Sequence, residues 1–141
     1  MLVSTKGRYA LRVMVDLAEH EGEGFVPLRD IAARQQISDK YLESILKSLV
    51  RDHLIESLRG KNGGYQLARS ASDYTAGEVL RATEGSLAPV AGMDDVVRFR
   101  AEEPRCHAMW EGLDELIGRY LDDVKVSDLA TVSLAGNDYV I

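Results

Sequence analysis

A basic, glycine-rich stretch is the part of the sequence whose residue types and spacing most clearly indicate chemistry. Residues 59–67 read RGKNGGYQL and lie between two runs that favour β-strands, LIES at residues 54–57 and YQLA at residues 65–68. Consecutive glycines beside an asparagine are typical of a turn. The pattern therefore predicts a β-hairpin with a small, positively charged tip.

Such a tip is either an ordinary turn or a device for binding a polyanion. Arg59 and Lys61 can neutralise phosphates, and Asn62 can hydrogen-bond with a base edge or with a phosphate. Gly63 and Gly64 would let backbone N–H groups approach a ligand closely. The elements predicted beside the hairpin distinguish between the two interpretations.

Two helices are predicted directly before the hairpin. Apolar residues recur at helical spacing in residues 28–34 and again from Asp39 to about His53, and QQIS at residues 35–38 turns the chain between them. Ser38 is the expected N-cap of the second helix. Two helices joined by a tight turn and followed by a hairpin form a winged helix-turn-helix. The second helix of such a unit enters the major groove of B-DNA, which is about 12 Å wide.

The rest of the chain predicts a mainly helical protein. Helices are expected at residues 6–19 and 76–84, residues 91–102 are expected to form a loop, and Ser127 is expected to cap a last turn. A longer helix is predicted from Pro104, with an apolar stripe so broad that it needs two surfaces to bury it.

The predicted fold class is mainly α with a small β-hairpin: a winged helix-turn-helix DNA-binding domain plus a long C-terminal dimerisation helix. The expected organisation is a DNA-binding domain at residues 1–85, a connecting strand and loop at 86–102, the dimerisation helix and last turn at 103–131, and a mobile tail at 132–141.

Charge and composition are compatible with this interpretation. The net charge is −6, but residues 1–70 carry 11 basic and 9 acidic residues, whereas residues 71–141 carry 6 and 14. A basic face can therefore lie within an acidic protein. The apolar runs are too short to cross a bilayer, and the single cysteine fits a reducing compartment, so we expect a cytoplasmic protein with no membrane partner.

Five segments resemble one family of bacterial regulators. They read STKGRYALRVMVDLA, PLRDIAARQQIS, KYLESILKSL, LIESLRGKNGGYQLAR and TAGEVLRATEG, and together they are similar to the IscR–NsrR–CymR family of winged-helix transcription regulators. The resemblance implies a homodimer in which the helix from Pro104 crosses to the other subunit, and half-sites that form an imperfect palindrome in double-stranded DNA. It also implies that Lys6 and Arg8, in the opening helix, lie close to the DNA backbone.

The expected DNA-binding residues come from the opening helix, the outer face of the second helix of the motif, and the hairpin. They are Lys6, Arg8, Ser38, Lys40, Tyr41, Glu43, Ser44, Lys47, Arg59, Lys61, Asn62, Gly63, Gly64 and Tyr65. The ring of Tyr41 could instead belong to the core.

Many members of this family hold an iron–sulfur cluster through three cysteines, and this sequence departs from them at that point. It has one cysteine, Cys106, and Pro104 stands where the cysteine of the family's Cys-x-x-His-x-x-Trp run is expected, although His107 and Trp110 are kept. A cluster needs several thiolates. We therefore expect no cofactor and no metal ligands, and Cys106 as a buried or half-buried structural residue.

The chain ends in Asp138, Tyr139, Val140 and Ile141. The closest resemblance is to the cluster-free CymR type, which represses genes of cysteine metabolism and works with O-acetylserine sulfhydrylase. The four residues are similar to the tails of serine acetyltransferases, whose terminal isoleucine enters the active site of that enzyme. The C-terminal carboxylate of Ile141 would mimic the carboxylate of an amino-acid substrate. The alternatives are a chance match and packing of these residues on the dimer.

The expected function is thus a DNA-binding regulator, a repressor of cysteine or sulfur metabolism genes that the sulfhydrylase modulates. An alternative in the same family senses redox state or a small ligand through Cys106 or a pocket at the dimer interface. Two alternatives belong to other classes: a protein-interaction module that no longer binds DNA, and a thiol enzyme. No oxyanion donor or orienting group can be named for Cys106, so we expect no enzymatic activity.

Overall fold

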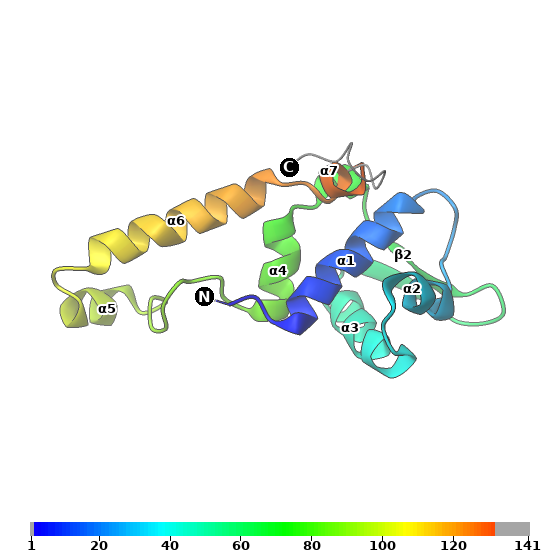
Figure 1. Ribbon diagram of the computed structural model, residues 1–141, viewed down its shortest axis with the longest axis horizontal. Coiled ribbons are helices and arrows are strands. Elements are labelled where there is room, and N and C mark those ends of the chain that lie inside the picture. Colours follow the sequence, from blue (N-terminus) through cyan, green and yellow to red (C-terminus); the bar gives the residue numbers. More distant parts are fainter. Residues whose placement is uncertain (1, 132–141) are drawn as a thin grey trace.

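The computed structural model describes residues 2–131 and shows a mainly helical chain with one two-stranded antiparallel sheet (Figure 1). In chain order the elements are α1 (Thr5–Glu19), α2 (Leu28–Gln35), α3 (Asp39–Arg51), β1 (Ile55–Leu58), β2 (Gly64–Leu67), a short 3-10 helix (Ala71–Asp73), α4 (Ala76–Glu84), α5 (Val96–Glu102), α6 (His107–Asp123) and α7 (Val126–Ala130). No helix in residues 2–131 is both long enough and apolar enough to cross a membrane.

Side-chain hydroxyl groups cap the N-termini of three helices. The hydroxyl of Ser4 accepts from the backbone N–H of Gly7 at α1, and Ser38 accepts from Tyr41 at α3. Thr75 accepts from Glu78 at α4. An N-cap hydroxyl satisfies one of the backbone N–H groups that a helix leaves unpaired, so these residues define the first turn. The predicted cap at Ser38 is confirmed.

The core lies between α1 and α3, and each helix contributes one apolar stripe. From α1 the buried residues include Val13 and Met14, and from α3 they include Leu42 and Leu46. The spacing of three and four places each set on one helical face. The inward face that the sequence predicts for α3 is confirmed, and the opposite face of α3 is left free for solvent or a ligand.

The turn between α2 and α3 has a defined geometry. Gln36 adopts the left-handed conformation with φ 55°, and its backbone N–H donates to Ala32 at the end of α2. Asp16 of α1 is only 2% exposed, and it accepts two hydrogen bonds from Arg34 and one from Gln35. α1 therefore fixes the end of α2 and the start of the turn, because a buried carboxylate is tolerated only where it is paired.

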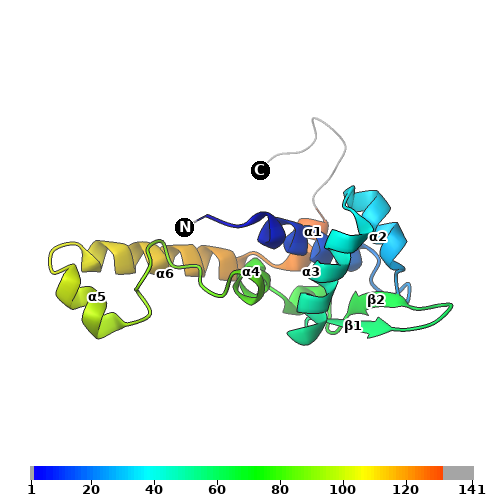
Figure 2. The same ribbon diagram turned by 90° about the horizontal axis from the view of Figure 1, so that it is seen from below.

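The hairpin and the long helix α6 lie at opposite ends of the molecule. Figures 1 and 2 show α6 extending away from the body formed by α1 to α4, with α5 at its far end and the β1–β2 hairpin on the other side of the body. None of the residues of α6 is buried. The arrangement is the predicted winged helix-turn-helix with a long projecting helix.

The C-terminal half differs from the sequence-based prediction in three features. Residues 96–102 form helix α5 rather than a loop, because Asp95 caps the helix by accepting from the N–H of Arg98, and Phe99 is buried with 7% exposure. α6 begins at His107 rather than at Pro104. The N-cap of α7 is Lys125 rather than Ser127.

The last helix, α7, returns to the body and packs on α1. Val126 is fully buried and is part of the same core as α1 and α3. The segment before α7 runs beside the start of α4, where the N–H of Val126 donates to the carbonyl of Tyr74 and the N–H of Ala76 donates to that of Val124. The two ends of α6 therefore differ: the C-terminal end is anchored in the body, whereas the N-terminal end projects away from it.

Candidate nucleic-acid interface

The free face of α3 carries a row of polar and charged side chains. Lys40, Glu43, Ser44 and Lys47 are exposed and line a shallow hollow on the surface of the helix. Lys47 Nζ lies 3.7 Å from Glu43 Oε1, one helical turn away. The sequence predicted these four residues on the outer face, and the structure places them together there.

Two further predicted residues at the start of α3 have structural contacts. Ser38 is exposed and its hydroxyl is used as the cap of the helix. Tyr41 is half-buried, and its ring meets that of Tyr9 edge-on, with 5.9 Å between ring centroids. The ring of Tyr41 therefore contributes to the contact between α1 and α3, as the alternative interpretation of this residue expected.

The hairpin is a regular antiparallel pair that is attached to the segment before α2. Its register pairs Ile55 with Leu67 and Leu58 with Gly64. Val26 adds one further rung, because its N–H donates to the carbonyl of Tyr65 at 2.8 Å and its carbonyl accepts from the N–H of Tyr65 at 2.9 Å. This rung holds the hairpin beside the first residues of α2.

The two consecutive glycines permit close backbone contacts in the hairpin. A Cβ atom on Gly64 would collide with the carbonyl of Val26, and φ at Gly64 is +150°. A Cβ atom on Gly63 would collide with the carbonyl of Leu58. The N–H of Gly63 donates to the carbonyl of Gly60 within the turn. In this structure the glycines are thus required first by the hairpin itself.

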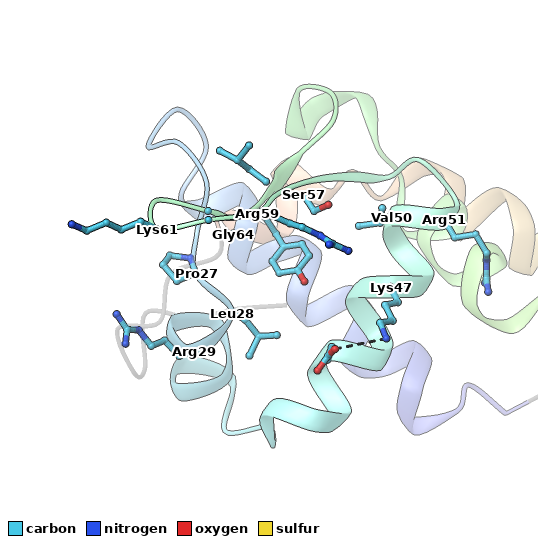
Figure 3. Close-up of a pocket in the computed structure, with 15 residues that line it drawn as sticks. Pro27, Leu28, Arg29, Lys47, Val50, Arg51, Ser57, Arg59, Lys61 and Gly64 are labelled. Atoms are coloured by element: carbon cyan, nitrogen blue, oxygen red, sulfur yellow. Dashed lines mark ion pairs between the residues drawn. The ribbon is translucent and has the colours of Figure 1, made fainter.

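A groove of about 870 Å³ separates the hairpin from α3 and from the N-terminal turn of α2 (Figure 3). Figure 3 shows Arg59 extending from the hairpin over the groove toward α3, while Lys61 points outward from the hairpin tip. The groove is lined by five cationic side chains and one carboxylate, namely Arg29, Lys47, Arg51, Arg59, Lys61 and Glu43.

The charges around the groove are suited to a polyanion. Within residues 2–131, Arg29, Arg59 and Lys61 have no ion-pair partner, so their charges are available to a ligand. Arg51 lies 3.6 Å from Asp52, but 70% of its side chain is exposed. A phosphate backbone lying in the groove would meet cations from three separate elements.

The sequence-based selection omitted Arg29 and Arg51. Arg29 belongs to the first turn of α2 and is far from the hairpin in the sequence, whereas Arg51 is the last residue of α3 and precedes β1 closely. No local pattern places them in the groove, because their position depends on how α2 and α3 pack against the hairpin. Asn62 is exposed at the tip, and Tyr65 lines the groove.

The two residues predicted on the opening helix lie apart from this groove. Lys6 is half-buried, and its Nζ donates to the hydroxyl of Ser48 on α3 at 2.8 Å. Arg8 is exposed on α1. Neither lines the groove. A contact of Lys6 or Arg8 with DNA remains a prediction, and in the structure Lys6 connects α1 to α3.

The family model of Rrf2, described as an iron-dependent transcriptional regulator, matches residues 3–132. The chain belongs to the Rrf2 family of transcriptional regulators. The HTH-type transcriptional regulator CymR of Bacillus subtilis is 37% identical over 131 residues, which are 93% of this chain and 91% of that protein. The HTH-type transcriptional regulator IscR of Serratia proteamaculans is 38% identical over 136 residues, covering 92% of this chain and 79% of that protein.

Solved structures show the same fold. The structure of CymR, the global cysteine regulator of Bacillus subtilis, superimposes with a TM-score of 0.81 at 35% identity, covering 94% of this chain and 98% of that one. IscR of T. potens superimposes with a TM-score of 0.70 at 38% identity, covering 92% and 85% of the two chains. These relatives are transcription regulators and not enzymes, which agrees with the expectation that this chain is not an enzyme.

The family description includes iron, so the donor set of this chain has to be compared with what iron requires. Iron–sulfur clusters are held mainly by cysteine thiolates, and the chain contains one cysteine. His107, the histidine of the family's cluster motif, directs Nδ1 toward Glu111 at 3.1 Å. No group of three His, Cys, Asp or Glu side chains within residues 2–131 could hold a metal ion. The residues described do not fit a cluster.

Cys106 is exposed, and the prediction of a buried or half-buried structural thiol is wrong. It is the N-cap residue of α6, and Figure 1 shows that this end of α6 is the one remote from the body. The sequence did not indicate that Cys106 is exposed, because the broad apolar stripe of α6 suggested a helix covered by other elements. The thiol is therefore accessible to oxidants in the single chain.

Proposed function

We propose that this transcription regulator binds an imperfect palindrome in double-stranded DNA as a homodimer, with α3 in the major groove and the β1–β2 hairpin as the wing. The observation that carries the proposal is the cationic groove between the hairpin and the free face of α3. Its cations come from α2, α3 and the hairpin. Cations placed on both sides of the groove in this way can contact the phosphate backbone that separates the major groove of DNA from the minor groove. The exposed side chains of α3 would then face base edges.

Duplex binding as a function of salt tests this proposal. Lys61→Ala should weaken binding to all sequences and should reduce the magnitude of the salt slope by about one unit, because one phosphate contact is lost. Arg98→Ala is the matched control, since Arg98 is a similarly exposed cation on α5, remote from the groove. An unchanged slope for Lys61→Ala would contradict the placement of the wing. Absence of any salt-dependent duplex binding would favour the protein-interaction module instead.

The proposed homodimer is supported by the exposed apolar face of α6. Met109, Leu113, Leu116 and Tyr120 recur at helical spacing and are 56%, 39%, 59% and 71% exposed. A contiguous apolar stripe of this kind is typical of an interface. A second copy of the chain would supply the second surface that the stripe needs, and a two-fold dimer matches the two halves of a palindrome.

Cysteine metabolism is the proposed target of regulation, because the similar protein from Bacillus subtilis is a global cysteine regulator. The proposed partner enzyme is O-acetylserine sulfhydrylase, bound through Asp138–Ile141. These four residues lie outside the described part of the chain, so the support is the sequence resemblance alone. Calorimetric titration into the enzyme, with the whole chain and with a chain lacking residues 138–141, tests it. We expect the deletion to abolish binding and leave the dimer intact; equal affinities would contradict it.

A second candidate is regulation by oxidation of Cys106. The exposed thiol favours it, and a crystal structure of Staphylococcus aureus CymR in an oxidized form is among the similar structures, with 34% identity and a TM-score of 0.72. We expect peroxide to lower the DNA affinity of the native chain and to leave Cys106→Ser unaffected. Equal loss of affinity in both proteins would exclude Cys106 as the sensor. The same variant tests the thiol-enzyme alternative, which requires a turnover that disappears with the thiol.

A further inference from the structure

The base of the hairpin is closed by a side chain that belongs to neither strand. Leu54 directly precedes β1, and Arg69 follows β2 after Ala68. Between them lies the hydroxyl of Tyr74, which donates to the carbonyl of Leu54 at 2.6 Å and accepts from the backbone N–H of Arg69 at 2.9 Å. One oxygen atom therefore connects the two points at which the chain enters and leaves the hairpin.

The environment of Tyr74 keeps this oxygen in place. The residue is fully buried, and burial raises the pKa of its phenol, so the hydroxyl keeps its proton at neutral pH. The guanidinium of Arg69 lies 4.3 Å from the ring centroid and pairs with both carboxylate oxygens of Glu78 on α4. The ring is thus covered by an ion pair and cannot rotate toward solvent without breaking it.

The backbone of Tyr74 is connected to the end of the projecting helix. Its carbonyl accepts from the N–H of Val126 at 3.0 Å, and Thr75 forms an antiparallel bridge with Lys125, two residues after α6 ends. Asp122 in the last turn of α6 also pairs with Arg81 on α4, at 2.6 Å. The residue that closes the hairpin is therefore bonded to the segment in which α6 terminates.

We propose that Tyr74 is a positioning residue for the wing: its hydroxyl sets the angle at which the hairpin leaves the body, and its backbone ties that angle to the end of α6. Besides this base, the hairpin contacts the body through the rung at Val26 and through its strands, which pack on α1 and α3 with Ile55 buried in the core. Removal of the hydroxyl would leave the N–H of Arg69 without this acceptor and the carbonyl of Leu54 with only the 3.3 Å bond from the N–H of Ala68, so the base of the hairpin would relax. The inference rests on the proposed role of the hairpin as a wing.

Tyr74→Phe removes one oxygen and keeps the ring, so the chain should still fold. Backbone hydrogen exchange of this variant should accelerate more at the amides of residues 55–58 and 64–69 than in α1. Its duplex affinity should fall about tenfold, the equivalent of losing one to two buried hydrogen bonds. Val13→Ala, a core change in α1, is the control for general destabilisation: it should lower thermal stability without accelerating the hairpin amides more than those of α1, and without altering DNA affinity.

A double-mutant cycle with Lys61→Ala shows whether the loss of affinity acts through the wing. If Tyr74 positions the wing, Lys61→Ala should cost much less in the Tyr74→Phe background than in the native chain. Arg69→Ala is the second variant: it removes the cation that covers the ring but keeps the backbone N–H and the hydroxyl, so hairpin exchange should accelerate less than in Tyr74→Phe.

The outcomes separate the inference from the proposed function. Unchanged hairpin exchange in Tyr74→Phe would overturn the inference, and so would additive losses of affinity in the cycle. Failure of the native chain to bind any duplex would refute the proposed function, whereas the exchange measurement would still decide whether Tyr74 holds the hairpin. Faster hairpin exchange together with non-additive losses supports both.

Discussion

The Nη2 atom of Arg12 donates a 2.6 Å hydrogen bond to the backbone carbonyl of Gln35, the last residue of α2. Its Nε donates to the side-chain oxygen of the same glutamine at 3.1 Å, and the guanidinium lies 4.7 Å from the ring centroid of Tyr9. Tyr9 in turn meets Tyr41 on α3. α1 therefore holds both the turn of the helix-turn-helix and the first turn of the helix proposed to enter DNA.

The first prediction is that Arg12→Gln weakens DNA binding through the position of α3 rather than through lost charge. An arginine at a helix C-terminus satisfies a free carbonyl, and losing such a charged hydrogen bond costs about 1.5–3 kcal/mol. Because the contact is internal, the salt slope of binding should stay unchanged. A slope that falls by about one unit would show instead that Arg12 contacts a phosphate.

Much of this framework was predictable from local patterns. The stripe of α3 from Leu42 to Leu49 repeats every three to four residues, and Ser38 is a strong cap, so the helix could be located closely. The hairpin was marked by the glycines at its tip. These signals arise from interactions between residues that are near one another in the sequence.

Other features depend on contacts over long sequence distances and gave no local signal. α5 is seven residues long and lacks clear periodicity, and it is held by Phe99 and by the pair of Arg100 with Glu111, which lies in α6. The Tyr74 hydroxyl donates to the carbonyl of Leu54, which lies 20 positions earlier in the sequence. The groove cation of α2, Arg29, converges with those of the hairpin only through tertiary packing.

The second prediction concerns the glycines of the hairpin. Gly64→Ala should destabilise the chain by about 1–3 kcal/mol and reduce DNA affinity, because the new Cβ collides with the carbonyl of Val26 and breaks the rung that holds the hairpin. Gly60→Ala is the matched control. Gly60 also has a positive φ, of +111°, but a Cβ there meets no atom within 4 Å, so only backbone strain is added. Thermal unfolding and duplex titration of both variants measure the difference.

The third prediction is that α5 loosens in acid. Hydrogen bonds from Arg100, with a contribution from His107, lower the pKa of Glu111 to about 2, against an ordinary value of 4.5. A carboxyl whose folded-state pKa is depressed stabilises the folded chain above its unfolded pKa, and this contribution is lost as the pH falls from about 4.5 toward 2. Fluorescence of Trp110, the only tryptophan and the neighbour of Glu111, should therefore change in this window.

Glu111→Gln is the test of that assignment. The variant should show the acid-loosened signal already at neutral pH, because an amide cannot form the charged pair with Arg100. Glu102→Gln is the control, since Glu102 pairs with Arg98 within α5 and does not connect the two helices. A transition of the native chain in the same pH window that persists in Glu111→Gln would assign it to other carboxyls, such as Asp122, whose pKa Arg81 also lowers.

The fourth prediction concerns the exposed stripe of α6. Leu116→Asp should convert the proposed dimer into a monomer, because the substitution places an uncompensated carboxylate in each copy at an apolar interface, where an unpaired buried charge costs about 3–5 kcal/mol. Glu115→Ala is the control: Glu115 is the preceding residue of the same helix, is 76% exposed and lies off the stripe. Sedimentation equilibrium gives the assembly state, and duplex titration gives the consequence for binding.

A monomeric variant should lose most of its affinity for a palindrome while binding a single half-site as weakly as the native chain does, because only the linkage between half-sites is removed. If Leu116→Asp remains a dimer, the two copies associate through another surface, and the orientation of the two α3 helices has to be derived anew.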